Sequence, residues 1–452
     1  MNFKKDRKGK GLRLLSRLLT VGALAVPVAA CSVDEILEVE DPDFATPIGL
    51  ESPAGIPILF QGAIGDFATG FIGQGDAAGP PIIEGYVMSS ALFTDEWYST
   101  DPFVDRLALD RRELRVPQQG NRSDAAFARL HRARRQINGA IAAAERVGGN
   151  AVTAAQTAEL RALQGYVFVL LAEGFCGAIP FSGSGAGEFG TPLTTEQTLD
   201  SALVYFDMAL ALDAGSNLAK IGRGRALLNL NRPADAAAAV SGIGTGYEYL
   251  IGQSSNSTRT QNQIFGLQNN NRFSQSENEG INGLAYRTDP RNPESDQRLG
   301  FDGSTPMFQS LKYSSFDDPV VLASGVEARL IEAEAALRAG ATGTFVDRLN
   351  SARTQAAANA GVTLPAVTDP GTAASRRDLL FAERGYNLYL TGTRLGDLRR
   401  LIRQYGRTED EVYPTGVPTQ GGAYGNDVNF SIPFAEQNNP LYKPEQCITT
   451  QA

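Results

Sequence analysis

Apolar residues recur at intervals of three and four along much of this chain, the spacing that places them on one face of an α-helix. In residues 124–147 the apolar positions Phe127, Leu130, Ile137 and Ile141 follow this spacing. The same pattern predicts helices over 153–175, 194–210, 217–228, 233–240, 324–337, 344–359, 375–390 and 395–405. We therefore predict a mainly α-helical protein.

Polar residues mark the starts of several of these helices. A Ser or Thr followed three residues later by Glu or Gln is typical of a capping box, in which both side chains satisfy free backbone amides. This spacing occurs as Thr153 with Gln156, Thr194 with Gln197, and Ser324 with Glu327. Pro233 suits the first turn of a short Ala-rich helix.

Residues 217–240 have the pattern of a tetratricopeptide repeat, with a helix, a short turn and a second helix of small residues. Gly222, Ala226 and Ala236 would let the two helices approach closely. Residues 332–347 have a similar pattern. We interpret these stretches as degenerate helix-pair repeats, although helical hairpins unrelated to any repeat would have the same pattern.

Two long regions lack helical periodicity. Residues 68–122 are rich in Gly, Pro and Asp, and residues 242–320 are rich in Gly, Asn, Gln and Ser. Irregular stretches of this length are usually functional surfaces or are packed against a scaffold. We expect strands only as small hairpins within these two irregular excursions.

The first thirty residues are predicted to be a signal peptide. A basic start is followed by a short apolar run and by Val28-Ala29-Ala30-Cys31, which resembles a bacterial lipobox. Processing before Cys31 would leave that cysteine lipidated and the protein anchored to a membrane by acyl chains alone. The alternative is an ordinary signal peptide with a chance cysteine.

An acidic tether over residues 31–45 is predicted to follow the lipidated cysteine, and residues 46–452 are predicted to form a single domain. The whole chain has 41 basic and 50 acidic residues, a formal net charge of −9. Because residues 1–30 hold seven basic residues and one acidic residue, the remainder has a net charge of −15. This charge argues against binding to nucleic acid through phosphate contacts.

The residue types argue against most enzymatic and metal chemistry. The chain has one histidine, His131, which we expect on a helix surface, and three cysteines. We therefore expect no catalytic residues, no metal site and no cofactor. Cys176 and Cys447 remain once Cys31 is lipidated, and they form either a disulfide or two unpaired buried thiols.

Several motifs resemble the SusD/RagB-like family of outer-membrane lipoproteins. Besides the lipobox, they are the helix over 158–180, Arg329-Leu-Ile-Glu-Ala-Glu-Ala335, the charged segment 383–399, and the residues Ile432, Pro433, Glu436, Asn439 and Pro440 near the end. The chain departs from the family pattern at Asn387 and Thr391, and Pro53 and Pro57 interrupt the usual long first helix. Glu383, Arg394, Asp397 and Arg399 are expected to pair with one another as structural charges.

The resemblance implies a scaffold of four tetratricopeptide-like helix pairs, with the ligand site on the irregular excursions. It also implies a non-enzymatic protein of the outer membrane, facing the cell surface, that binds a glycan and delivers it to a SusC-like TonB-dependent transporter. The alternatives are a peptide-binding lipoprotein of the same architecture, a helical scaffold that binds only protein partners, and a surface hydrolase.

Aromatic and polar residues in the excursions are the candidates for the ligand site. Sugar rings present apolar faces that stack on aromatic rings, while their hydroxyl groups need polar partners. The candidates are Trp97, Tyr98, Phe103, Tyr286 and Tyr313, with Asn269, Asn270 and Arg272. If it binds ligand, Trp97 should lie at the rim of a shallow surface. The alternative for each residue is packing of the loop onto the scaffold.

Overall fold

The computed structural model describes residues 47–75, 83–183, 187–277, 280 and 283–452. Residues 47–452 form one compact unit. The predicted signal peptide, Cys31 and the acidic tether lie outside the described residues.

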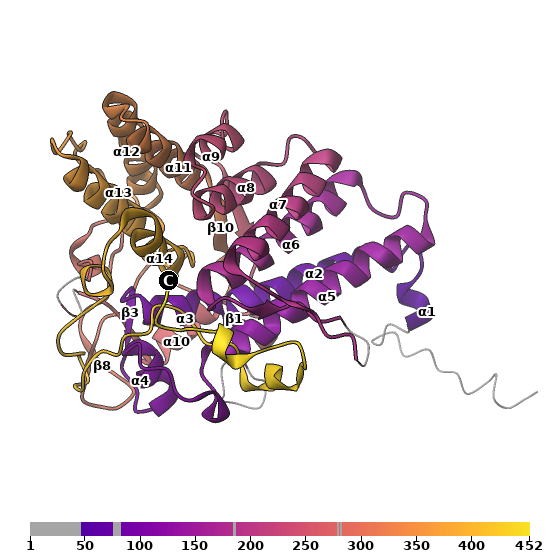
Figure 1. Cartoon of the computed structure of the whole chain (residues 1–452), viewed down its shortest axis with the longest axis horizontal. Coiled ribbons are helices and arrows are strands. Elements are labelled where there is room, and N and C mark those ends of the chain that lie inside the picture. Colours follow the sequence, from indigo (N-terminus) through magenta and orange to yellow (C-terminus); the bar gives the residue numbers. More distant parts are fainter. Residues whose placement is uncertain (1–46, 76–82, 184–186, 278–279, 281–282) are drawn as a thin grey trace, which may run out of the picture. The chain divides into compact units, whose positions relative to one another are not determined.

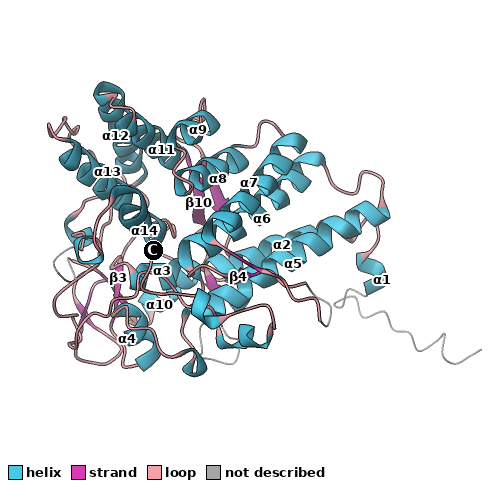
Figure 2. Cartoon of the chain, viewed as in Figure 1, coloured by secondary structure: helices cyan, strands magenta, loops and turns pink. Residues whose placement is uncertain are grey.

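Helices dominate the described part of the chain (Figures 1 and 2). They are α1 (Pro47–Leu50), α2 (Ile56–Phe71), α3 (Tyr86–Phe93), α4 (Val104–Asp110), α5 (Ser123–Val147), α6 (Ala154–Gly174), α7 (Thr195–Leu212), α8 (Asn217–Asn229), α9 (Pro233–Ala239), α10 (Gln263–Asn269), α11 (Gly325–Arg338), α12 (Thr342–Asn359), α13 (Ala373–Asn387) and α14 (Arg394–Tyr405). The prediction of a mainly α-helical protein is confirmed.

The scaffold consists of helix pairs. Helix α2 packs on α5, α6 on α7, α8 on α9, and α11 on α12 (Figure 1). The predicted capping boxes of α6 and α7 are both formed, by Thr153 with Gln156 and by Thr194 with Gln197. Ser324 caps α11 by accepting a hydrogen bond from the Glu327 amide.

The irregular excursions contain helices that the sequence pattern did not predict. Every residue of α3 is buried, so the helix has no polar face and therefore no amphipathic period. Helices α4 and α10 have seven residues each, too few to show a clear period. Pro57 does not interrupt α2, because it lies in the first turn, where no backbone amide is needed.

Strands form only two-stranded antiparallel pairs among the described residues. The pairs are β1 (Gly73–Gln74) with β2 (Ile83–Glu84), β3 (Trp97–Ser99) with β7 (Phe273–Gln275), β4 (Ile179–Pro180) with β5 (Pro192–Leu193), β6 (Glu248–Ile251) with β10 (Val320–Ser324), and β8 (Arg298–Leu299) with β9 (Pro306–Met307). Two expectations were wrong: β4 and β5 lie outside the excursions, and β3–β7 and β6–β10 join distant segments instead of forming hairpins.

Glycines on α8 allow three helices to approach closely. A Cβ atom on Gly222 would clash with the Phe206 ring of α7, and one on Gly224 would lie 2.7 Å from Val240, just after α9. The expected close approach of α8 and α9 is therefore made at Gly224, whereas Gly222 accommodates α7.

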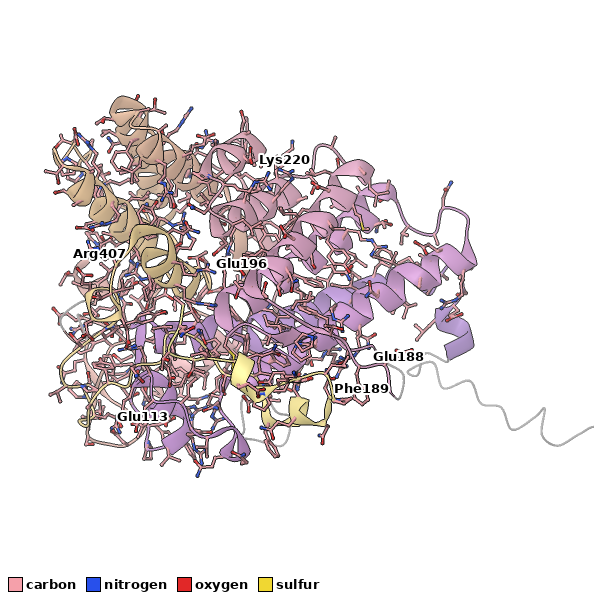
Figure 3. All side chains as sticks on the ribbon, viewed as in Figure 1. Glu113, Glu188, Phe189, Glu196, Lys220 and Arg407 are labelled. Atoms are coloured by element: carbon pink, nitrogen blue, oxygen red, sulfur yellow. A yellow bond between two sulfur atoms is a disulfide. The ribbon has the colours of Figure 1, made fainter. Side chains whose placement is uncertain are left out.

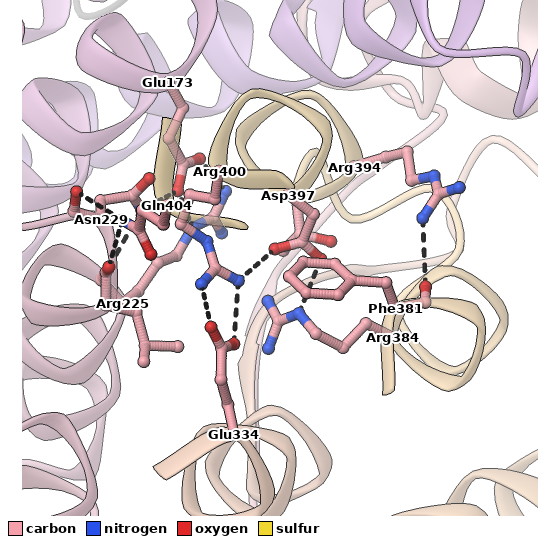
Figure 4. Close-up of polar contacts among 12 residues, drawn as sticks. Glu173, Arg225, Asn229, Glu334, Phe381, Arg384, Arg394, Asp397, Arg400 and Gln404 are labelled. Carbon is pink, nitrogen blue, oxygen red and sulfur yellow. Dashed lines mark hydrogen bonds and ion pairs between the residues drawn. The ribbon is translucent and has the colours of Figure 1, made fainter. Parts of the chain in front are cut away.

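A network of buried ion pairs joins helices from the middle and the end of the chain (Figure 4). Arg225 of α8 pairs with Glu173 of α6, and Arg400 of α14 pairs with Glu334 of α11. Asp397 accepts hydrogen bonds from Arg384 at 2.7 Å and from Arg400 at 2.8 Å. Burial alone would raise the pKa of Asp397, but the two arginines lower it to about 2.

The charged motif of segment 383–399 is structural, but its expected pairing was wrong. Glu383 binds Arg291 and Arg353 from other segments. Arg399 donates to the carbonyls of Ala172, Glu173 and Phe175, which lie at the end of α6, and Arg394 donates to the Phe381 carbonyl. Arg399 binds these carbonyl groups because the end of α6 lacks intrahelical donors, whereas the Phe381 carbonyl lies within α13.

The C-terminal segment runs along the end of α6 and is covalently attached to it. Cys176 and Cys447 form a disulfide, with their Cα atoms 5.1 Å apart. Backbone hydrogen bonds join Phe430 to Gly174 and Cys176. The loop that carries Phe189 also lies beside this segment, where Asn439 donates to the Gly190 carbonyl at 2.9 Å (Figure 3).

His131 lies in the core and not on a helix surface, which corrects the sequence-based expectation. Its ring lies 4.5 Å from that of Phe127 and 5.2 Å from that of Phe181. Burial lowers the pKa of His131 well below its usual value, and Arg134 and Arg135 lower it further. The histidine is therefore neutral and packs as an aromatic residue.

Candidate functional site

The two irregular excursions are joined to each other by a strand pair. Strand β3 of the first excursion pairs with β7 of the second, with Trp97 opposite Gln275 and Ser99 opposite Phe273. Residues that are about 170 positions apart in the sequence are thereby neighbours, as in the hydrogen bond from Thr100 Oγ1 to the Asn271 carbonyl at 2.7 Å. Candidate residues from both excursions can therefore contribute to one site.

Most of the aromatic candidates are buried. Trp97 and Tyr286 have no exposed surface, and Tyr98 and Tyr313 are almost as deeply buried. The Trp97 indole donates to the Tyr389 hydroxyl at 3.1 Å, and the Tyr98 hydroxyl donates to the Pro306 carbonyl at 2.8 Å. The expectation that Trp97 lies at the rim of a shallow surface is wrong, because the pairing of β3 with β7 places its ring against the scaffold.

Phe103 and Arg272 are the candidates that the structure brings together at the surface. Phe103 is 44% exposed and immediately precedes α4. The Arg272 guanidinium lies 5.3 Å from the centre of the Phe103 ring and 3.8 Å from that of Phe301. Phe301 is 49% exposed. These three residues define what we name the Phe103–Phe301 surface.

Phe301 was not among the candidates predicted from the sequence, although the residues around it gave a signal. It lies in Leu299-Gly-Phe-Asp-Gly303, where a large apolar residue is flanked by glycines in a turn. The Asp302 carboxylate accepts the amides of Ser304 and Thr305, which fixes the turn. The Phe301 amide donates to the Asn271 carbonyl at 2.7 Å, which places the ring beside Arg272.

Buried charges hold Arg272 in place. Asp101 accepts hydrogen bonds from Arg272 at 3.2 Å and from Arg106. Arg106 also binds Glu84, with its Nε 2.7 Å from the carboxylate. Burial lowers the pKa of Arg272, and Arg106 lowers it further, but a guanidinium remains charged at neutral pH.

Asn269 and Asn270 are exposed at the end of α10, close in sequence to Arg272. Their side-chain amides have no hydrogen-bond partner among the described residues. Arg272 itself has five N–H donors and uses one of them on Asp101. The surface thus offers two exposed aromatic rings, with the largely buried Arg272 guanidinium close to both.

Metal binding and membrane spanning have no support in the described part of the chain. Its His, Cys, Asp and Glu residues form no group of three or more that could hold a metal ion. None of its helices combines the length and apolar character required to cross a membrane.

Comparisons with known proteins identify the fold. No protein-family model matches this chain, and no curated protein matches it in sequence. A SusD superfamily protein from Bacteroides vulgatus is 16% identical, with a TM-score of 0.63 over 87% of this chain and 99% of that one. A SusD-like carbohydrate-binding protein from Bacteroides fragilis is 15% identical, with a TM-score of 0.61 over 87% and 99% of the two chains.

Surface glycan-binding protein A from Bacteroides uniformis is also similar in structure. It is 12% identical, and the match covers 86% of this chain and 99% of that chain with a TM-score of 0.57. At these identities the similarity is one of fold. The helix pairs, the excursions between them and these matches together show that this chain has the SusD-like fold.

Proposed function

We propose that this chain is a lipid-anchored protein of the cell surface that captures a glycan and passes it to a SusC-like TonB-dependent transporter in the outer membrane. Two of the solved structures with its fold are named carbohydrate-binding or glycan-binding proteins. The lipobox at Cys31 supports the anchor. In this proposal the protein binds the glycan without catalysing a reaction and needs no cofactor.

The Phe103–Phe301 surface is the observation that carries the glycan proposal. Exposed aromatic rings are costly in water, and they suit the apolar faces of sugar rings. The Arg272 guanidinium between the rings can donate to sugar hydroxyl groups. Asp101, itself held by Arg106, fixes this guanidinium in position before ligand arrives, which lowers the entropic cost of binding.

Retardation in native gels that contain soluble polysaccharides tests the proposal. Starch, xylan, mannan and pectin form a suitable panel. We expect Phe301→Ala and Phe103→Ala each to weaken binding by about 1–3 kcal/mol, the range for loss of one stacking platform. Phe434→Ala is the matched control, because Phe434 is also 44% exposed but lies on the C-terminal segment.

Equal losses of polysaccharide binding in all three variants would contradict this site. Unchanged binding in both Phe301→Ala and Phe103→Ala would also contradict it. Binding to a mixture of peptides, with no retardation by any polysaccharide, would favour the peptide-binding alternative.

The transporter is tested separately by purifying the protein from its native membrane in mild detergent. A SusC-like transporter in similar yield is expected, and recovery of the protein alone would count against this partner.

A further inference from the structure

A second concave site lies on the scaffold and uses none of the residues of the Phe103–Phe301 surface. It is a cavity of about 260 Å³ where the β6–β10 strand pair meets α12 and the end of α13. Its apolar wall includes Val321, Val326 and Leu388. The volume is just below the usual range for ligand pockets, which suits a molecule of one sugar or amino-acid residue.

One of the charged residues that line this cavity, Arg291, is already neutralised by ion pairs. Arg291 binds Asp289 and Glu383, with N–O distances of 2.6 and 2.7 Å, and donates to the Asn387 side chain. Glu248 accepts a hydrogen bond from Asn359 at the exposed edge of the cavity. Arg291 is therefore compensated within the protein, whereas the Glu248 carboxylate keeps its negative charge at the edge of the cavity.

Lys312 differs from Arg291 in having no ion-pair partner among the described residues. Its ammonium group donates to the Tyr389 carbonyl, and no carboxylate of the described residues lies within ion-pair distance of it. An ammonium has three donors, so two remain for a ligand. Burial lowers the pKa of Lys312 to about 8, although the more distant Glu96 and Glu248 carboxylates act to raise it.

An unpaired ammonium at an apolar wall costs free energy, and a bound anion would remove this cost. We propose that this cavity binds a small ligand through a carboxylate group, which pairs with the Lys312 ammonium while the rest of the ligand packs on Val321, Val326 and Leu388. A carboxylate of this size has two plausible sources, a uronic acid unit of a glycan and the C-terminus of a peptide.

Lysine NMR tests this inference directly. In protein labelled with [ε-¹³C]lysine, Lys220 and Lys443 serve as internal controls, and the other four lysines lie within residues 1–10. The probes are glucuronate and N-acetyl-leucine, each compared with a neutral analogue, glucose and N-acetyl-leucinamide. We expect at least one carboxylate to shift the Lys312 resonance and raise its pKa by about one unit or more, as a nearby opposite charge does.

The probe that binds identifies the source of the carboxylate. The inference would be overturned if a carboxylate and its neutral analogue shifted the Lys312 resonance equally. It would also be overturned if neither acid shifted this resonance at a ligand concentration of about 10 mM, roughly the weakest binding of interest. Lys312→Met should abolish the binding measured by calorimetry, whereas Lys443→Met should leave it unchanged.

A second variant does not alter the lysine. Ala360 lines the cavity at the end of α12, so Ala360→Phe should fill the space and also abolish binding. Retained binding in this variant would contradict the cavity as the site. Because Phe301→Ala should not affect these measurements, failure here is distinguishable from failure of the proposed glycan function.

Discussion

Trp97 lies at the inner end of a stack of aromatic rings and guanidinium groups that ends in solvent. Its ring is 5.5 Å from that of Phe273, and the Arg106 guanidinium lies 5.3 Å from Phe273 and 5.4 Å from Phe103. Arg272 and Phe301 complete the stack at the surface. The buried members hold the two excursions together, and only the outermost rings are available to a ligand.

Trp97→Ala is expected to reduce stability without affecting the ligand site. Loss of a fully buried tryptophan should lower the free energy of unfolding by about 3–5 kcal/mol. Urea denaturation followed by circular dichroism measures this change. Variant protein that is as stable as the wild type but no longer binds polysaccharide would show that Trp97 contacts ligand after all.

His131 should remain neutral in the folded protein under mildly acidic conditions. Because it is the only histidine, its ring protons can be followed by NMR without assignment of other signals. We expect little change between pH 7.5 and 5.5 (about one unit on either side of the ordinary histidine pKa of ~6.5). The same titration in concentrated urea is the control and should have a midpoint near ~6.5.

The lowered pKa of His131 also determines whether the protein gains or loses stability as the pH falls. Below about 6.5 the unfolded chain takes up a proton at His131 that the folded protein does not, so the free energy of unfolding should decrease as the pH falls. A midpoint near the ordinary value in the folded protein would instead place His131 in contact with water.

Among the secondary-structure elements, α6 is connected to several distant parts of the molecule. Its capping box fixes its start, its side chains contact α5, α7 and α8, and its end binds Arg399 and the C-terminal segment. The disulfide between Cys176 and Cys447 closes a loop with a sequence separation of 271 residues. Such a link restricts the unfolded chain far more than the folded one.

Replacement of both cysteines by serine should therefore destabilise the protein by about 2–5 kcal/mol. The C-terminal segment should also become sensitive to limited proteolysis, because its remaining attachment consists of hydrogen bonds and packing. Comparison of the wild-type protein with and without reductant provides the control for the substitutions themselves. Unchanged stability and an equally resistant tail would contradict this role of the disulfide.

For the whole molecule, the proposed attachment to the membrane depends on one residue. With residues 1–30 removed, the chain has a net charge of −15, which gives it no electrostatic attraction to anionic lipid headgroups. Acyl chains on Cys31 would therefore supply the entire affinity for the membrane.

Cys31→Ser should move the protein from the membrane to the soluble fraction and remove the mass of the lipid. Cell fractionation with intact-mass spectrometry measures both effects. The Cys176→Ser Cys447→Ser variant is the control, because it loses cysteines but should stay anchored. Persistent membrane attachment of Cys31→Ser protein, at unchanged mass, would show that Cys31 is not the anchor.

Local sequence signals were enough to predict the scaffold helices from α5 onward, but not α2, which was absent from the helices predicted by periodicity. The starts of α6 and α7 followed from Thr153 and Thr194, because a capping box is a local interaction within four residues. The family resemblance correctly predicted the fold through motifs that the structure explains as buried ion pairs and bonds to helix ends. The partners of these charges could not be predicted, because Glu383 and Arg291 are neighbours only after folding.

Which aromatic residues are available at the surface depends on tertiary contacts. Trp97 and Phe301 are both large aromatics in segments without helical periodicity, and the turn around Phe301 does not by itself reveal that Arg272 lies beside the ring. The pairing of β3 with β7 buries the first, and the Asp302 turn exposes the second beside Arg272. Burial depends on contacts between segments far apart in the chain, whereas periodicity and capping signals report only on near neighbours in sequence.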